Sequence, residues 1–162
     1  MGIIMIKKNL VVENAKIAFK NFSGKEGQFN PEGKRNFCLI LDPELAEKLH
    51  ADGWNVRTLK PKDDGEIPQP YIQVSVSFLA KPPKIVLVTS RGKTLLTEET
   101  VGMLDWAEIT NVDLSVTPYQ WSVAGKNGVK AYLKNMYVTI QEDEFEKKYD
   151  DIPDSAMGSI ML

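Results

Sequence analysis

Apolar and polar side chains alternate along most of this chain, and such alternation is typical of half-buried β-strands. The run 71–78 is the clearest example, because its even-numbered residues are large and apolar while the others are polar or tyrosine. The same alternation directs Phe19, Phe37 and Phe78 toward a core. Strands are predicted over residues 16–22, 35–41, 71–78, 85–89, 112–123 and 129–140.

Two short helices are predicted between these strands. Asp42 is suited to an N-cap and Pro43 to the first helical position, and Asp52-Gly53 would end this helix. A second helix is predicted over 97–106, with Thr97 as its cap. The segments 23–34 and 61–70 are rich in glycine and proline and are predicted loops.

The runs 112–123 and 129–140 are predicted to form a β-hairpin. Between them lies Gly125-Lys126-Asn127-Gly128, and Asn127-Gly128 tolerates the positive φ angles of a tight turn. Pro118 cannot donate a hydrogen bond within a sheet, so an edge position or a bulge is expected there. Several strands of irregular spacing, with few helices, favour a mostly β fold and a small Greek-key barrel over a sandwich.

Composition narrows the possible classes of protein. The 162 residues are enough for one domain, and 43% hydrophobic with 26% charged residues is the ordinary globular balance. A single cysteine, Cys38, and a single histidine, His50, argue against a thiolate zinc cluster and a two-histidine metal site, so no cofactor is expected. No apolar run reaches the roughly 18 residues of a membrane span, so a cytoplasmic protein is expected.

Charge is distributed unevenly along the chain. Residues 141–162 hold seven acidic residues against two lysines, a formal charge of −5, which leaves +3 for residues 1–140 of a chain that totals −2. We therefore expect a domain over 1–141 and a disordered acidic tail over 142–162. A mildly basic body suggests a polyanionic partner, although ordinary solvated surface would have the same balance. The candidate partner-binding residues of the tail are Glu142, Asp143, Glu144, Asp150, Asp151 and Asp154.

Sequence motifs for catalysis are absent. There is no phosphate-binding loop and no dinucleotide-binding glycine pattern. His50 lies near the end of a predicted helix, where an exposed surface role is expected. An enzyme is therefore not expected.

Aromatic residues beside lysine or arginine recur along the chain instead. On the run 129–140, Lys130, Tyr132 and Lys134 share a face opposite Val129 and Ala131. Bases of single-stranded nucleic acid stack on exposed aromatic rings while nearby cations neutralise phosphates. The hairpin aromatics would equally form a cross-strand cluster that only stabilises the hairpin.

Three segments carry a resemblance to a known family. The segments 21–42, 52–57 and 109–140, above all PYQWSVAGKNGVKAYL at 118–133, resemble the single-stranded-DNA-binding proteins of tailed bacteriophages. The resemblance covers about residues 14–140 and implies an OB-type barrel that binds single-stranded DNA without strong sequence preference in phage replication and recombination. It also implies that the acidic tail binds replication or recombination partners, while a homodimer or cooperative coating of the strand would multiply contacts.

Together these observations predict a non-catalytic DNA-binding groove. The stacking candidates are Phe22, Trp54, Tyr71, Tyr119, Trp121 and Tyr132. The phosphate-binding candidates are Lys20, Lys25, Lys34, Arg35, Arg57, Lys130 and Lys134. A β-rich structural protein of a virion and a metal-dependent nucleic-acid enzyme are the alternatives.

Overall fold

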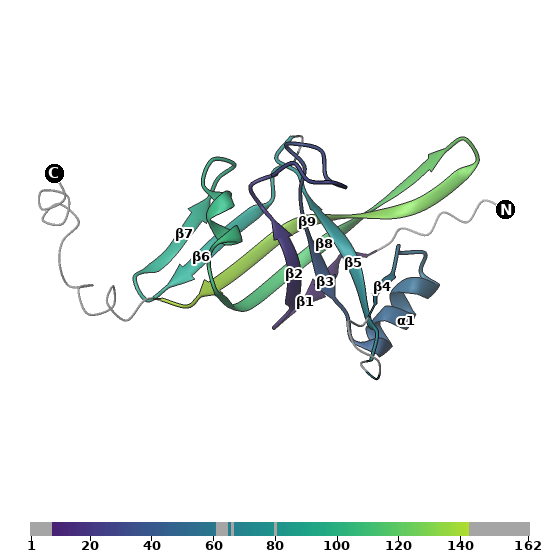
Figure 1. Cartoon of the computed structure of the whole chain (residues 1–162), viewed down its shortest axis with the longest axis horizontal. Coiled ribbons are helices and arrows are strands. Elements are labelled where there is room, and N and C mark those ends of the chain that lie inside the picture. Colours follow the sequence, from purple (N-terminus) through teal and green to yellow (C-terminus); the bar gives the residue numbers. More distant parts are fainter. Residues whose placement is uncertain (1–7, 61–64, 66, 80, 143–162) are drawn as a thin grey trace, which may run out of the picture.

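The computed structural model describes residues 8–60, 65, 67–79 and 81–142. The predicted tail beyond Glu142, with Asp143, Glu144, Asp150, Asp151 and Asp154, lies outside the described residues. The elements are β1 Leu10–Val12, β2 Lys16–Asn21, β3 Arg35–Ile40, α1 Pro43–Ala51, β4 Arg57–Leu59, β5 Gln69–Val76, β6 Lys84–Thr89, β7 Gly92–Leu96, the 3-10 helix η1 Val101–Asp105, β8 Ile109–Val123 and β9 Lys126–Ile140 (Figure 1).

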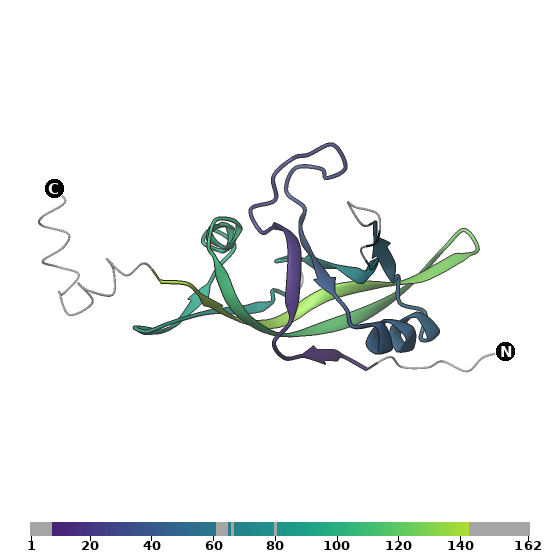
Figure 2. The same cartoon turned by 60° about the horizontal axis from the view of Figure 1, so that its bottom comes forward.

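The strands form one curled sheet in the order β1-β8-β9-β5-β3-β2. Neighbouring strands in this order are antiparallel except β5 and β9, which run parallel. The segment of β1 and β2 closes the sheet, because β1 pairs with β8 at one edge and β2 pairs with β3 at the other. The result is a partly open Greek-key barrel of the OB type, as expected (Figure 2).

The core fills the inside of this curled sheet. Phe22 and Phe37 are completely buried, and their rings stack with centroids 5.4 Å apart. Ile72, Val74 and Val76 of β5 are also buried, so the predicted alternation of this strand is confirmed. Each such side chain contributes about 1.5–3 kcal/mol through its removal from water.

The β6–β7 hairpin forms a wing at one end of the sheet. β6 runs parallel to β9, with Val86 opposite Tyr137, and β7 pairs with β6 along its other edge (Figure 1). β1, β4 and β7 were not among the predicted strands. Each is only three to five residues long, too short to give a clear alternation.

The β8–β9 hairpin is the longest element and projects beyond the barrel (Figure 1). Its turn differs from the prediction. Ala124 and Gly125 adopt the positive φ angles of 52° and 79°, whereas Asn127 and Gly128 lie within β9. The pairing of β1 with β8 ends at Leu10 and Val116, two residues before Pro118. Pro118 is therefore at an edge, as expected.

The first predicted helix is confirmed and the second is shorter than expected. The Asp42 side chain accepts a hydrogen bond from the Leu45 N–H at 2.7 Å and caps α1. The region 97–106 forms only η1, which buries Val101 and Leu104. No helix among the described residues has the length and apolar character to cross a membrane.

Phe19 contradicts the prediction that it belongs to the core. The pairing of β2 with β3 shifts register between Ala18 and Asn21, and Phe19 adopts a positive φ of 51°. This irregularity interrupts the alternation, so that 70% of Phe19 is exposed while Phe22 enters the core instead.

Candidate nucleic-acid interface

A groove of about 480 Å³ lies between the loop 22–34 and the outer side of the sheet. The loop connects β2 to β3, and β3, β5 and β9 supply the rest of the groove. In this type of barrel, the loop after the first strand and the hairpin between the last two flank the oligonucleotide-binding face. The lining residues include Phe29, Lys34, Arg35, Gln73, Ser75, Lys130 and Tyr132.

The loop 22–34 is organised by its own polar contacts. The Asn30 side-chain amide donates to the carbonyls of Lys25 and Lys34 at 2.8 and 3.0 Å, and its oxygen accepts from the Asn36 amide at 2.8 Å. Gly24 and Gly33 approach so closely that a Cβ on Gly24 would lie 3.0 Å from the Gly33 backbone. The ordered loop leaves Phe29 91% exposed beside the groove.

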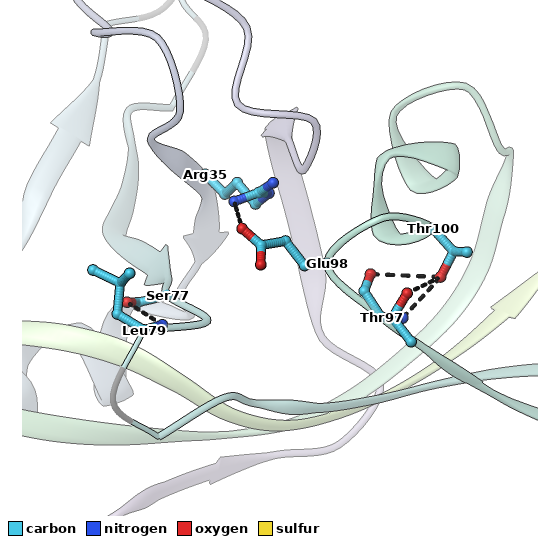
Figure 3. Close-up of polar contacts among 6 residues, drawn as sticks. All are labelled: Arg35, Ser77, Leu79, Thr97, Glu98 and Thr100. Carbon is cyan, nitrogen blue, oxygen red and sulfur yellow. Dashed lines mark hydrogen bonds and ion pairs between the residues drawn. The ribbon is translucent and has the colours of Figure 1, made fainter.

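Arg35 lines the groove in a fixed position. Its Nη1 lies 3.5 Å from Glu98 Oε1, and its guanidinium lies 5.5 Å from the centre of the Phe78 ring. Figure 3 shows the Glu98 carboxylate directed at Arg35, close to a turn in which the Thr97 N–H donates to the Thr100 hydroxyl at 2.8 Å. Within the described part of the chain, the buried Arg35 Nε has no hydrogen-bond partner.

The outer side of the β8–β9 hairpin carries four of the predicted residues, Tyr119, Trp121, Lys130 and Tyr132, which we call the hairpin face. The rings of Tyr119 and Tyr132 meet edge to face at 6.2 Å, and the Lys130 Nζ lies 5.1 Å from the Tyr132 ring centre. Val129, Ala131 and Leu133 are buried on the opposite side of β9, which confirms the predicted faces of this strand.

A second hollow extends the groove along the hairpin. It measures about 220 Å³ and shares Gln73, Ser75 and Lys130 with the groove. Trp121 lines its far end, where the indole lies against Gly128 of the paired strand. The two hollows therefore form one path from Phe29 to Trp121.

Two of the predicted binding residues are placed elsewhere by the structure. Phe22 is completely buried in the core, so its ring presents no face on which a base can stack. Trp54 is only 5% exposed and packs in the core, but it also lines the second hollow. The Lys20 ammonium donates to the carbonyls of Leu104 and Ala107 at 2.8 and 2.9 Å, which ties it to the end of η1 rather than to a phosphate.

The remaining predicted residues, Lys25, Arg57, Tyr71 and Lys134, line neither hollow. Arg57 of β4 pairs with Tyr71 of β5. Tyr71 is two residues from Gln73 on β5, so these two side chains lie on the same face of the strand. Lys25 lies on the loop 22–34, with its Nζ 4.4 Å from the Trp106 ring centre. Lys134 is exposed on β9 at the point where its register with β8 shifts.

Cys38 lies on the outer face of β3, opposite Gln73. Burial raises the pKa of its thiol above the ordinary 9.0, and the positive charge of Arg57 partly offsets this rise. The thiol is therefore protonated at neutral pH and adds no charge to this face.

Several exposed aromatic residues were not among the candidates. Phe29 was detectable in principle, because an aromatic residue between Gly27 and Pro31 in a loop has no strand face to bury it. Trp106, 78% exposed, gave no such signal, because the helix predicted there would have provided a packing face. Within the described residues, no three side chains of histidine, cysteine, aspartate or glutamate come together as metal ligands.

The comparisons with known proteins agree with this geometry. Residues 2–161 match the model of a family described as "Putative phage ssDNA-binding domain". No curated protein matches the chain in sequence.

Solved structures with the same fold include two from one bacteriophage. The C-terminally truncated single-stranded DNA-binding protein from bacteriophage Enc34 is similar with a TM-score of 0.50 and 13% identity, over 83% of this chain and 87% of that chain. The single-stranded DNA-binding protein from the same phage gives a TM-score of 0.50 and 11% identity, over 83% of this chain and 82% of that chain.

Proposed function

Because the chain belongs to the family of phage single-stranded-DNA-binding domains, we propose that it binds single-stranded DNA without sequence preference in the groove between the loop 22–34 and the hairpin face. The observation that carries this proposal is the composition of the groove. It combines the cations Lys34, Arg35 and Lys130 with the accessible rings of Phe29 and Tyr132.

Each kind of side chain has its own task in this binding mode. The rings provide surfaces on which bases stack, and stacking tolerates any sequence because every base has a π-face. The lysines and Arg35 neutralise phosphates. Gln73 and Ser75 line both hollows with uncharged polar groups.

The proposal is of a binding protein and not of an enzyme. We further propose that residues 1–141 form the DNA-binding domain and that the acidic segment 142–162 binds replication or recombination proteins of the phage or its host. The chain would then protect single strands in the cytoplasm of the host during replication and recombination. A homodimer would add a second groove and raise the affinity for long strands.

Titration of labelled oligothymidine by fluorescence anisotropy tests the binding. The affinity should fall as salt rises, with a log–log slope of about −2 if the three groove cations each neutralise one phosphate. Oligocytidine of the same length should bind with similar affinity, and duplex DNA more weakly. A slope near zero would contradict the electrostatic groove, and release of nucleotides with magnesium would indicate an enzyme.

A further inference from the structure

A second cluster of cations around an aromatic ring lies on the wing, away from the groove. The ammonium groups of Lys84 on β6 and Lys93 on β7 each lie 5.9 Å from the centre of the Tyr137 ring on β9. We call these three residues the wing cluster. Within the described part of the chain, neither lysine forms an ion pair.

The wing cluster faces the same side of the sheet as the hairpin face. On β8, Asp113 and Thr117 are four residues apart and so share a face, and they pair with Tyr137 and Tyr132. Tyr132 and Tyr137 are five residues apart and would point to opposite faces of a regular strand. The register shift of β9 against β8 next to Lys134 adds one residue and brings both tyrosines to the same face.

The surface between the two sites is polar and positively charged. Tyr137 comes five positions after Tyr132 along β9, a distance of about 16 Å. Lys134 is exposed between them, and Asn135 donates a hydrogen bond to the Ser115 hydroxyl at 3.2 Å. The residues that line the groove along this edge of β9 extend to Leu79, which is five residues before Lys84 in the chain.

From these observations we propose that single-stranded DNA continues beyond the groove along the outer face of β9 and ends on the wing cluster, where a base stacks on Tyr137 between Lys84 and Lys93. This inference rests on the proposed function. The wing cluster repeats the chemistry of Lys130 and Tyr132, with a cation within 6 Å of a ring, and it does so on the same face.

An acidic peptide is the competing ligand for two lysines, but the aromatic ring favours nucleic acid. Both cations lie within 6 Å of the Tyr137 ring centre, so a base stacked on that ring would have cations near its phosphates. The carboxylate of Asp113, opposite Tyr137, accepts hydrogen bonds from the Asn14 N–H at 2.9 Å and the Asn111 amide at 3.3 Å. This carboxylate would repel phosphates and acidic side chains alike, so it does not distinguish the two ligands.

The test compares the double variant Lys84→Gln/Lys93→Gln with the native chain on two oligothymidines. One has about 8 nucleotides, within the range of site sizes for such barrels, and the other has about 20, beyond that range. The double variant should bind the long oligonucleotide about 25-fold more weakly at 0.1 M salt, since each lost phosphate contact on a single strand lowers the log–log slope by about 0.7. The short oligonucleotide, which the groove alone accommodates, should bind with unchanged affinity.

The matched control is Lys16→Gln/Lys48→Gln, which removes the same charge from exposed positions on β2 and α1. If both double variants lose the same affinity for the long strand, or if neither loses any, the path to the wing is wrong and a protein partner becomes the better ligand for the cluster. Equal losses on both lengths would also overturn the extended path. Failure of the native chain to bind either oligonucleotide would instead contradict the proposed function itself.

Discussion

The ring of Tyr132 packs edge-on against Tyr119 and also lines the groove, so two contributions to free energy depend on one residue. An aromatic pair of this geometry contributes about 0.5–1.5 kcal/mol to stability beyond its buried area. Stacking of a base contributes about 1–3 kcal/mol to binding. The hairpin on which Tyr132 lies is also anchored by buried residues such as Leu133, so its fold does not depend on this ring alone.

Tyr132→Ala should therefore weaken the binding of oligothymidine by about 1–3 kcal/mol, the usual contribution of one stacked base. Thermal unfolding should shift only slightly, because the loss of the Tyr119 contact is small. Tyr132→Phe is the matched control and should bind normally, since a phenyl ring retains the π-face. A large drop in melting temperature with normal binding by the folded fraction would identify Tyr132 as a packing residue.

Alternation along a strand was sufficient to identify the face of Tyr132 but not the surroundings of Phe22 or Trp54. Residues 129–140 form a regular strand over the part that carries Lys130 and Tyr132, so period-2 logic holds there. Phe22 lies after an irregularity in β2, and Trp54 lies between α1 and β4, where no strand period applies. A shift of one residue exchanges core and surface, and nothing in the composition of 16–22 indicates that shift.

At the scale of elements, one glycine of the β8–β9 hairpin makes room for the Trp121 ring on the opposite strand. A Cβ at Gly128 would lie 2.8 Å from the Cζ2 atom of the Trp121 indole, so only glycine leaves room for the ring across the strand pair. This explains why the Asn-Gly dipeptide is present without forming the turn, which Ala124 and Gly125 make instead. The glycine accommodates a ring here and does not supply a positive φ.

Gly128→Ala should displace the Trp121 indole from its position beside the second hollow. We expect binding of oligothymidine to weaken about fivefold, the lower end of the loss of one stacking surface. The tryptophan emission spectrum should also change, which can be followed in a Trp106→Phe background, where Trp54 and Trp121 are the remaining emitters. Asn127→Ala, at an exposed neighbouring position, should change neither property. Unchanged emission and affinity in Gly128→Ala would show that the indole does not need this space.

Local sequence signals identified the elements better than their partners. The α1 cap, the strand β5 and the hairpin arms are encoded within a few residues, and each was predicted. The groove and the wing cluster depend on pairings between distant segments, such as β5 with β9 and β6 with β9. No local pattern links Lys84 and Lys93 to Tyr137, so their meeting could not be inferred without the sheet order.

For the whole molecule, the uneven distribution of charge becomes the dominant feature. The described residues end at Glu142, whose Oε1 accepts hydrogen bonds from the N–H and hydroxyl of Ser90 at the β6–β7 turn. Residues 143–162 contain six acidic residues and two lysines. These charges are tethered to a domain whose groove and wing cluster carry cations, so the local concentration of competing negative charge is high.

Truncation after Glu142 should therefore tighten the binding of oligothymidine at low salt, by about threefold to tenfold near 20 mM, and change it little above 0.3 M, where screening is strong. The hydrogen bond from the Gln141 N–H to the Glu108 carbonyl, at 2.7 Å, and the contacts of Glu142 with Ser90 are retained in this variant. A full-length variant with the six acidic residues replaced by their amides separates charge from chain length and should behave like the truncation. Both variants should also lose the capture of replication or recombination proteins from a phage-infected host. Weaker binding of the truncated chain at low salt would mean that residues 143–162 contribute to the DNA site, and would contradict competition between the acidic segment and the DNA.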